Sequence, residues 1–130
     1  MKKIILMFIL ICSFSFAMKD IESETLYNGD SDIVIGELYT GTFNSENEKD
    51  TKLKREQKYL MEKDEFQYFN DKNGKNGIAF KASYKTPEDY TISFKGFCGD
   101  KYISVYGNYI YFDQLLEIFL KHTTQAGYEF

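Results

Sequence analysis

Three stretches of the sequence follow one another at a fixed interval, and this spacing constrains the fold more than any other feature. Two series of residues recur every 25 positions, an aliphatic series and a tyrosine series: Leu53, Ile78 and Ile103, and Tyr59, Tyr84 and Tyr109. A constant interval of this length is typical of a strand-turn-strand unit that is repeated along a chain. We therefore predict that residues 53–69, 78–94 and 103–112 are three related sheet-building units.

The aromatic content also favours a sheet. The chain has 11 Tyr and 12 Phe, no Trp, and a single proline at Pro87. Tyrosine and phenylalanine fit the pleated, half-buried surface of a strand, and a chain of this length forms one domain. We predict a mainly β fold at the margin of the α+β class. It is an antiparallel β-meander of repeated hairpins over residues 33–130, closed by one C-terminal capping helix.

The clearest hairpin is predicted for residues 78–94. Apolar and polar side chains alternate through its first arm and again through its return arm, which is the pattern of a half-buried strand. Between the arms, residues 86–89 read Thr-Pro-Glu-Asp, and a proline at the first central position favours a type I turn. A strand or tight hairpin is predicted at residues 33–43. A further strand is predicted at residues 66–69, followed by two Asn-Gly pairs that favour a hairpin turn.

Residues 51–64 admit two interpretations. As a helix, the segment stacks Leu53 and Leu60 seven residues apart, and its charged remainder has good helix propensity. As a strand, it places alternate residues on one face, of which only half are apolar. We predict a strand, because the 25-residue interval favours one and intrinsic propensity is a weak guide against tertiary context. A helix here would reduce the three units to two.

The C-terminal part is predicted to hold a last strand pair and a helix. Residues 102–106 and 108–112 are expected to pair around the turn dipeptide Gly107-Asn108. Asp113 is a suitable N-cap, and the apolar residues that follow it recur at helical spacing: Leu115, Leu116, Phe119 and Leu120. This stripe predicts a helix over residues 113–123 that packs on the sheet.

The N-terminus has the layout of a secretory signal peptide. Two lysines precede an apolar run that ends in small residues, and Lys19 and Asp20 follow before the run is long enough to cross a membrane. We expect cleavage after Ala17 and removal of residues 1–17. The mature protein is then periplasmic or secreted, without stable membrane insertion. The polar residues 18–32 are expected to form a flexible N-terminal arm.

The charge balance narrows the set of partners. Removal of the signal peptide would leave 14 basic and 20 acidic residues, a net charge of about −6. Such a chain lacks the excess of lysine and arginine that displaces counterions from phosphates, so nucleic acid and anionic lipid are not expected partners. Polar residues alternate over 28–32 as in a calcium loop, but Ile33 stands where that loop needs glycine and Tyr39 where it needs glutamate. No metal or other cofactor is predicted.

Three segments of the chain resemble a known family. They read Leu-Tyr-Thr-Gly-Thr-Phe at residues 38–43, Lys-Leu-Lys-Arg-Glu-Gln-Lys-Tyr at 52–59 and Tyr-Phe-Asn-Asp-Lys-Asn-Gly-Lys at 68–75. In this order they are similar to segments of the YwqK/MORN-like repeat proteins, which are known as antitoxin components. The resemblance implies an open β-meander that serves as a binding surface, a toxin-neutralising partner role, and no catalytic residues. The family's glycine-containing turn is replaced here by residues 60–64.

Tyrosines crowd a short segment near the C-terminus, at Tyr102, Tyr106, Tyr109 and Tyr111. A strand pair in a one-layer sheet cannot bury tyrosines on both of its faces, so some are expected at the surface. Exposed tyrosine serves protein recognition or stacks on sugar rings. The other interpretation, a covered core face, stays open. The main functional hypothesis is an exported, non-enzymatic interaction module that binds a protein, a peptide or a glycan.

Cys98 and His122 support an alternative hypothesis, a small envelope enzyme or inhibitor built on a thiolate-imidazole pair. Against it, Cys98 lies in a predicted turn and not at a helix N-terminus, which would lower its pKa. His122 lies near the end of a predicted helix, where an imidazole interacts favourably with the helix dipole. Because Cys12 is removed with the signal peptide, Cys98 has no partner for an intramolecular disulfide. Structural roles for both residues, and no enzymatic activity, are the primary expectation.

Overall fold

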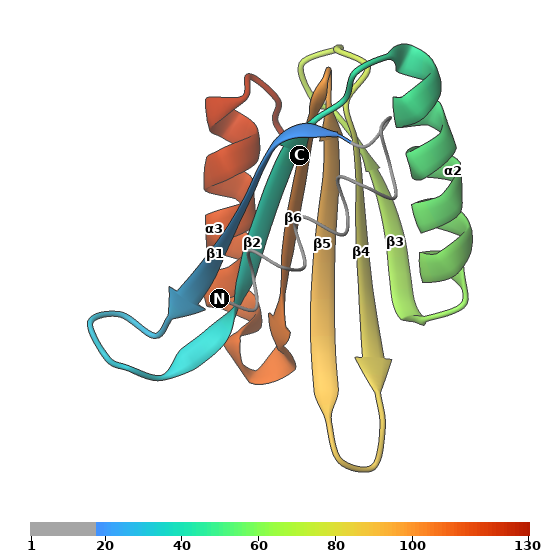
Figure 1. The fold of residues 1–130 in the computed structure, drawn as a ribbon. Coiled ribbons are helices and arrows are strands. Elements are labelled where there is room, and N and C mark those ends of the chain that lie inside the picture. The colour runs from blue at the N-terminus through green and yellow to red at the C-terminus, as the bar shows by residue number, and fades with distance from the viewer. Residues whose placement is uncertain (1–17) are drawn as a thin grey trace.

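The computed structural model describes residues 18–130, so the predicted signal peptide at residues 1–17 lies outside the described part of the chain. Over these residues the chain forms one six-stranded antiparallel sheet and two α-helices (Figure 1). This architecture confirms the prediction of a mainly β, antiparallel fold with a C-terminal helix. The elements in chain order are β1 (Lys19–Tyr27), β2 (Val34–Thr42), α2 (Glu46–Met61), β3 (Asp64–Asn70), β4 (Ile78–Lys85), β5 (Tyr90–Cys98), β6 (Lys101–Asn108), the 3₁₀ helix η1 (Tyr109–Tyr111) and α3 (Phe112–Gln125).

The strand order across the sheet is β1-β2-β6-β5-β4-β3. β3 to β6 form a meander, and β1 and β2 form a hairpin that joins it through the pairing of β2 with β6. Along β5, Phe94 and Gly96 contact Phe119 of α3, whereas the intervening Lys95 pairs with Glu56 of α2. Because successive strand residues point to opposite faces, the two helices cover opposite faces of the sheet, which we call the α2 face and the α3 face.

The predicted hairpin of residues 78–94 is confirmed. β4 and β5 pair in one continuous register through to Lys85 opposite Tyr90. The turn is closed by the Thr86 N–H, which donates to the Asp89 carbonyl at 2.7 Å. In the return direction the Asp89 N–H donates to the Thr86 hydroxyl at 3.0 Å. Alternation and turn chemistry, both visible in the sequence, therefore predicted this unit correctly.

The strand predicted within residues 51–64 is wrong, because residues 51–61 belong to α2, which ends at Met61. The Ser45 hydroxyl caps this helix by accepting the N–H of Glu48 at 3.1 Å, and the Glu48 carboxylate accepts the N–H of Asn44 at 3.0 Å. These bonds satisfy amides near the helix start that have no intrahelical partner. Charged residues of good helix propensity continue the helix, and only Leu60 is buried. The predicted repeat thereby loses its first copy.

The second arm of the predicted C-terminal strand pair, residues 108–112, is also wrong. β6 ends at Asn108 and the chain continues into η1. β6 pairs with β2 along one edge and with β5 along the other, so neither edge is left for a return strand. The Asn108 side chain accepts the N–H of Ile110 at 3.1 Å, which turns the chain away from the sheet.

The flexible arm predicted for residues 18–32 is wrong over most of its length, because β1 occupies Lys19–Tyr27. β1 pairs antiparallel with β2, and Leu26 is buried in the core. The Asn28 N–H donates to the Ile33 carbonyl at 2.9 Å and closes the hairpin. A polar segment can form an edge strand because one of its faces is solvated.

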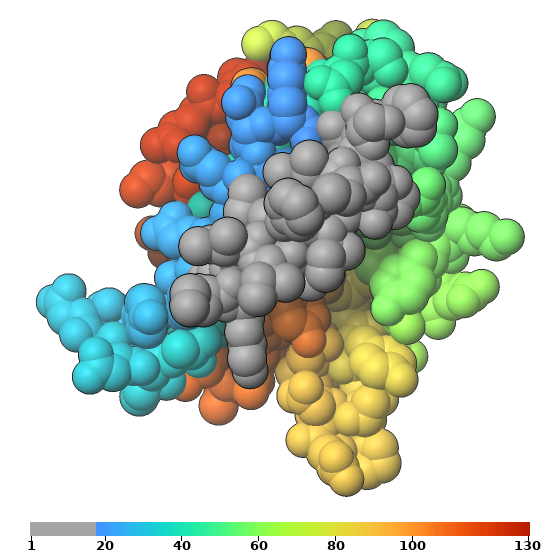
Figure 2. Space-filling model, viewed as in Figure 1, coloured from blue at the N-terminus to red at the C-terminus, as the bar shows by residue number. Residues whose placement is uncertain are grey.

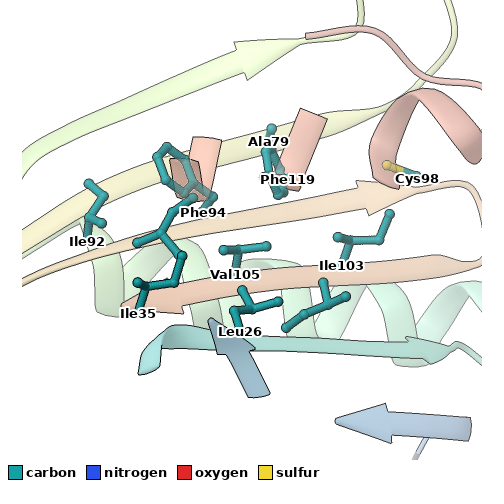
Figure 3. Packing of buried hydrophobic residues seen from close by; sticks show 11 residues of the cluster. Leu26, Ile35, Ala79, Ile92, Phe94, Cys98, Ile103, Val105 and Phe119 are labelled. Carbon is teal, nitrogen blue, oxygen red and sulfur yellow. The ribbon is translucent and has the colours of Figure 1, made fainter. Parts of the chain in front are cut away.

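α3 confirms the helix predicted at residues 113–123, although its N-cap is Tyr111 and the predicted cap, Asp113, lies in the first turn. The helix approaches the sheet closely at Gly96, where a Cβ atom would lie 3.1 Å from the Phe119 ring. Five strands and α3 supply the buried residues of this core (Figure 3): Leu26, Ile35, Leu38, Ala79, Ile92, Phe94, Cys98, Ile103, Val105, Leu115 and Phe119.

A second, more aromatic core lies on the α2 face. Phe97 stands near its centre, with its ring centroid 5.9 Å from that of Phe43 and 5.9 Å from that of Phe80. α2 contributes the buried Leu60 and the half-buried Leu53. The buried residues of this core are Phe43, Leu60, Phe80, Ala82, Phe97 and Tyr102. The helix on this face is therefore anchored by few apolar side chains of its own.

Candidate functional site

The four tyrosines predicted as a binding surface do not share one. Tyr102 is buried beneath α2, and Tyr106 lies four residues further along β6 on the same face with 49% of its surface exposed. Tyr109 belongs to η1, where its ring stacks on that of Tyr90 with 4.0 Å between centroids. Tyr111 packs against the core of the α3 face. The end of β6 at Asn108 separates these side chains, because residues beyond it no longer follow strand alternation.

Tyr109 is engaged in a structural contact. Its hydroxyl donates to the Glu65 carboxylate at 3.0 Å, and the Tyr90 hydroxyl donates to the same carboxylate at 3.1 Å. The hydrogen bonds to Glu65 and Tyr90 raise the pKa of Tyr109 to about 12. These three side chains join β3, β5 and η1. Of the predicted four, Tyr106 alone is an exposed side chain on the α2 face.

A hollow on the α2 face brings Tyr106 together with two tyrosines from other elements. We call it the Tyr–Lys hollow and define it by Tyr59, Lys63, Tyr84 and Tyr106, which surround a volume of about 130 Å³. The exposed fractions of Tyr59, Tyr84 and Tyr106 are 56%, 50% and 49%, so a ligand can reach these side chains. The remaining lining residues are Leu60, Ala82, Ser83, Thr91 and Ser93.

Three elements position the side chains of the hollow. Tyr84 in β4 and Tyr106 in β6 point to the α2 face because they alternate with residues of the α3 face. Tyr59 lies in the last turn of α2. Lys63 follows where the chain leaves the helix, and its N–H donates to the Leu60 carbonyl at 2.9 Å. The end of α2 thus holds Tyr59 and Lys63 beside the tyrosines of the sheet.

The ammonium group of Lys63 lies over two of these rings, 4.4 Å from the Tyr59 centroid and 4.3 Å from the Tyr84 centroid. The negative face of an aromatic ring attracts a cation in this position. Within residues 18–130, no carboxylate forms an ion pair with Lys63. Its ammonium hydrogens can therefore be donated to a ligand without the loss of an ion pair to this part of the chain.

A charged network lies nearer the start of the same helix, between α2 and the sheet. Glu56 of α2 pairs with Lys52 at 3.3 Å and with Lys95 of β5 at 3.6 Å. The Tyr102 hydroxyl donates to Glu56 at 3.3 Å, and the Lys95 ammonium donates to the Tyr102 hydroxyl at 3.1 Å. The side chains of Lys52, Glu56, Lys95 and Tyr102 thus connect α2 to β5 and β6.

Burial dominates the electrostatics of this network. It lowers the pKa of Lys95, and the negative charge of Glu56 opposes that shift. Burial, reinforced by the charge of Glu56, raises the pKa of Tyr102 well above its ordinary range. The phenol of Tyr102 is therefore protonated at neutral pH and donates its proton to the carboxylate, which is the pairing that the geometry shows.

A second cavity, on the α3 face, brings Cys98 and His122 together as residues of one lining. This Cys–His cleft has a volume of about 530 Å³ and lies between the start of β1, the β5–β6 turn and the C-terminal end of α3. Its lining also includes the acidic residues Asp20, Glu22 and Asp100. In the described part of the chain, no group of three or more His, Cys, Asp or Glu side chains could hold a metal ion.

The Cys98 thiol is poorly suited to nucleophilic attack. Cys98 is the last residue of β5, not part of the predicted turn, and it is 2% exposed within the core of the α3 face (Figure 3). Burial, reinforced by the charge of Asp71, raises the pKa of this thiol to about 12. The thiolate is the nucleophilic form of cysteine, and the raised pKa keeps the Cys98 thiol protonated at neutral pH.

Comparisons with known proteins add no assignment. No family model matches the sequence, and no match is found among the curated proteins or among the solved structures. The resemblance to the YwqK/MORN-like repeat proteins therefore stays a prediction. None of the helices within residues 18–130 is long and apolar enough to cross a membrane.

Proposed function

We propose that the chain is an exported, non-enzymatic interaction module that binds its partner at the Tyr–Lys hollow. The observation that carries this proposal is the convergence of three exposed tyrosines on one hollow beside Lys63. Tyrosine offers a large, stiff apolar surface with a polar tip, and it is enriched where proteins bind their partners. The binding surface is accordingly the α2 face, in place of the row Tyr102 to Tyr111.

Export is supported by the sequence of residues 1–17. Their basic start, apolar run and small terminal residues match a secretory signal peptide. An interaction module of this kind acts outside the cytoplasm, where its ligand is a component of the envelope or of the surroundings.

The test compares matched tyrosine variants on a ligand panel. The double variant Tyr84→Ala with Tyr106→Ala removes two rings of the hollow, and both side chains are exposed, so the core is left intact. Tyr27→Ala is the control, because Tyr27 is also 49% exposed but lies in β1. The proteins are applied to immobilised neutral, acidic and basic oligosaccharides and peptides. We expect a ligand that wild type and Tyr27→Ala retain and the double variant loses. Equal retention by all three proteins, or no retained ligand, contradicts the proposal.

An envelope enzyme or inhibitor at the Cys–His cleft is the second candidate, since Cys98 and His122 line the same cavity. The raised pKa of Cys98 weighs against it. Alkylation of the native protein with iodoacetamide at neutral pH distinguishes the two candidates. A thiol that is modified only after unfolding supports the interaction module, whereas rapid modification of the folded protein would favour a reactive site.

A further inference from the structure

We propose that the ligand of the Tyr–Lys hollow is an acidic carbohydrate. One sugar ring stacks on Tyr106, and its carboxylate or sulfate group accepts hydrogen bonds from Lys63, which lies between the rings of Tyr59 and Tyr84. This inference rests on the proposed function of the hollow and adds the chemical class of the ligand. The charge of α2, the surroundings of Lys63, and the lining and size of the hollow each contribute to it.

Residues 52–63 carry a net positive charge, whereas the remaining described residues carry a net negative charge. Residues 52–63, which form most of α2 and its link to β3, carry five basic and two acidic residues, a net charge of +3. The other residues of 18–130 carry nine basic and 18 acidic residues, a net charge of −9. The potential of a positive segment on a negative molecule steers an anionic ligand to that segment.

The basic side chains of this segment are spread along the helix. The helix forms one side of the molecule in the view of Figure 2 (green). Arg55 lies four residues before Tyr59, and side chains at this spacing share one flank of a helix. The Arg55 side chain is exposed. An acidic oligosaccharide with one ring in the hollow can therefore place its next acidic group near Arg55.

The position of the Lys63 ammonium group favours the binding of an anion. Its ammonium group is held between the rings of Tyr59 and Tyr84 and has no carboxylate partner among residues 18–130. A hydrogen bond between an ammonium and a carboxylate or sulfate oxygen is stronger than one between neutral groups. The two tyrosine rings restrict the position of the ammonium, so less side-chain freedom is lost when the ligand binds.

The lining of the hollow suits a sugar ring better than an acidic peptide. Lys63 is the one charged residue of the lining, and the tyrosines, Thr91 and Ser93 bring hydroxyl groups to it. Tyrosine faces pack against the flat C–H face of a pyranose, while hydroxyls can both donate to and accept from sugar hydroxyls. β4, β5 and β6 are paired along both edges, so the floor offers no strand edge to which a peptide backbone could pair.

The volume of the hollow sets the size of the bound unit. A volume of 130 Å³ corresponds to about four water molecules at roughly 30 Å³ each. Sites for drug-sized ligands begin at about 300 Å³. The hollow therefore admits a single ring, and the rest of the ligand lies along the surface. We infer that the ligand is an oligosaccharide or polysaccharide that is anchored by one acidic unit.

The test is calorimetric titration of the purified protein with four probes of equal length: oligogalacturonate, a sulfated heparin oligosaccharide, a neutral malto-oligosaccharide and oligoglutamate. The first two separate carboxylate from sulfate as the acidic group. Lys63→Gln removes the proposed anion contact. Lys54→Gln is the matched control, because it removes the same charge from α2 on a flank away from Tyr59. Tyr84→Ala removes a ring of the hollow that holds the Lys63 ammonium in place.

We expect one of the two acidic sugars to bind and the neutral sugar not to bind. Lys63→Gln should weaken binding roughly tenfold or more, since a charge-assisted hydrogen bond is lost. Lys54→Gln should change it less than about threefold, as expected for an exposed charge outside the contact. Added salt should weaken binding by screening.

Each other result overturns the inference in a distinct way. Binding of the neutral sugar as tightly as the acidic ones, or failure of both acidic sugars to bind, removes the acidic carbohydrate as the ligand. Preference for oligoglutamate assigns the hollow to a peptide. Equal weakening by Lys63→Gln and Lys54→Gln shows unspecific attraction. Where another probe binds, Tyr84→Ala should still weaken its binding, and failure of Tyr84→Ala to weaken any bound probe contradicts the proposed function itself.

Discussion

The two faces of the sheet are covered by helices that are held in opposite ways. α3 buries Leu115, Phe119 and Thr123 against an apolar core. α2 buries only Leu60, and Glu56 connects it to the sheet through charged and polar partners. α3 is consequently held by apolar packing, whereas α2 is held at a few points and leaves tyrosine side chains exposed on its face. The proposed binding site lies on the face where the helix contributes least to the core.

Phe119→Ala should show the largest loss of stability, and it tests whether apolar packing holds α3 on the sheet. Phe119 is 2% exposed and its ring lies 5.6 Å from that of Phe94, so the substitution leaves a cavity. We expect a loss of about 3–5 kcal/mol in the free energy of unfolding, measured by urea denaturation. The control Met61→Ala on α2, where the side chain is 60% exposed, should change it by less than about 0.5 kcal/mol. Similar losses for both variants would contradict the contrast.

Glu56→Gln tests whether charge holds α2. Glutamine keeps the size of the side chain but leaves the largely buried Lys95 ammonium without its carboxylate. We expect a loss of about 1–3 kcal/mol in the free energy of unfolding. Lys95→Met in the Glu56→Gln background should restore part of this loss, because the unpaired cation is gone. Strictly additive effects in the double-mutant cycle would show that the two side chains are not coupled.

Ser45→Ala tests whether the N-cap stabilises the start of α2. The Ser45 hydroxyl accepts the N–H of Glu48, and loss of an N-cap costs about 1 kcal/mol. Urea denaturation should detect this loss, with Lys54→Ala on the exposed helix surface as a control that is close to neutral. An unchanged free energy of unfolding in Ser45→Ala would mean that the cap does not hold the helix.

Asp71 gives the smallest effect and concerns the chain that follows α3. Its carboxylate accepts the N–H of Glu129 at 2.7 Å and that of Lys75 at 2.8 Å. These bonds, that of Glu129 first, lower the pKa of Asp71 below its ordinary value of 3.8. A carboxyl of lowered pKa stabilises the folded state above the unfolded value and loses this contribution as the pH falls through the folded value.

The free energy of unfolding of the wild type should therefore fall more steeply below pH 3.8 than that of Asp71→Asn. Urea denaturation at a series of acidic pH values measures both slopes. Parallel slopes would show that Asp71 does not tie the C-terminal residues to the β3–β4 link.

The contrast between the faces also explains which elements could be predicted from the sequence. The hairpin at 78–94 and the helix at 113–123 each bury one side, so their hydrophobic periods are visible in the residues. α2 has only Leu53 and Leu60 for such a period, and its other contacts are made by charged groups that no hydrophobic pattern reports. β6 was predicted to have a return strand because its second neighbour, β2, is distant in sequence and comes beside it only in the folded chain.

The candidate site was predictable in its chemistry but not in its residues. Tyrosine recognition was expected, and Tyr106 belongs both to the predicted row and to the hollow. Tyr59 and Tyr84 were marked by the 25-residue interval, yet that interval did not indicate that they meet. Their proximity depends on the crossing of α2 over the sheet from β2 to β3, which is a tertiary feature. Lys63 carried no signal of its own in the sequence.

Whether the α2 face carries the binding site is tested most directly by tyrosine nitration, read residue by residue with mass spectrometry. In the free protein we expect Tyr59, Tyr84 and Tyr106 to react and the buried Tyr102 to be spared. With the bound acidic oligosaccharide at saturation, these three reactive tyrosines should become protected while Tyr27 remains reactive. Undiminished nitration of the three in the presence of a ligand that binds by calorimetry, or protection of Tyr27 in their place, would contradict this assignment.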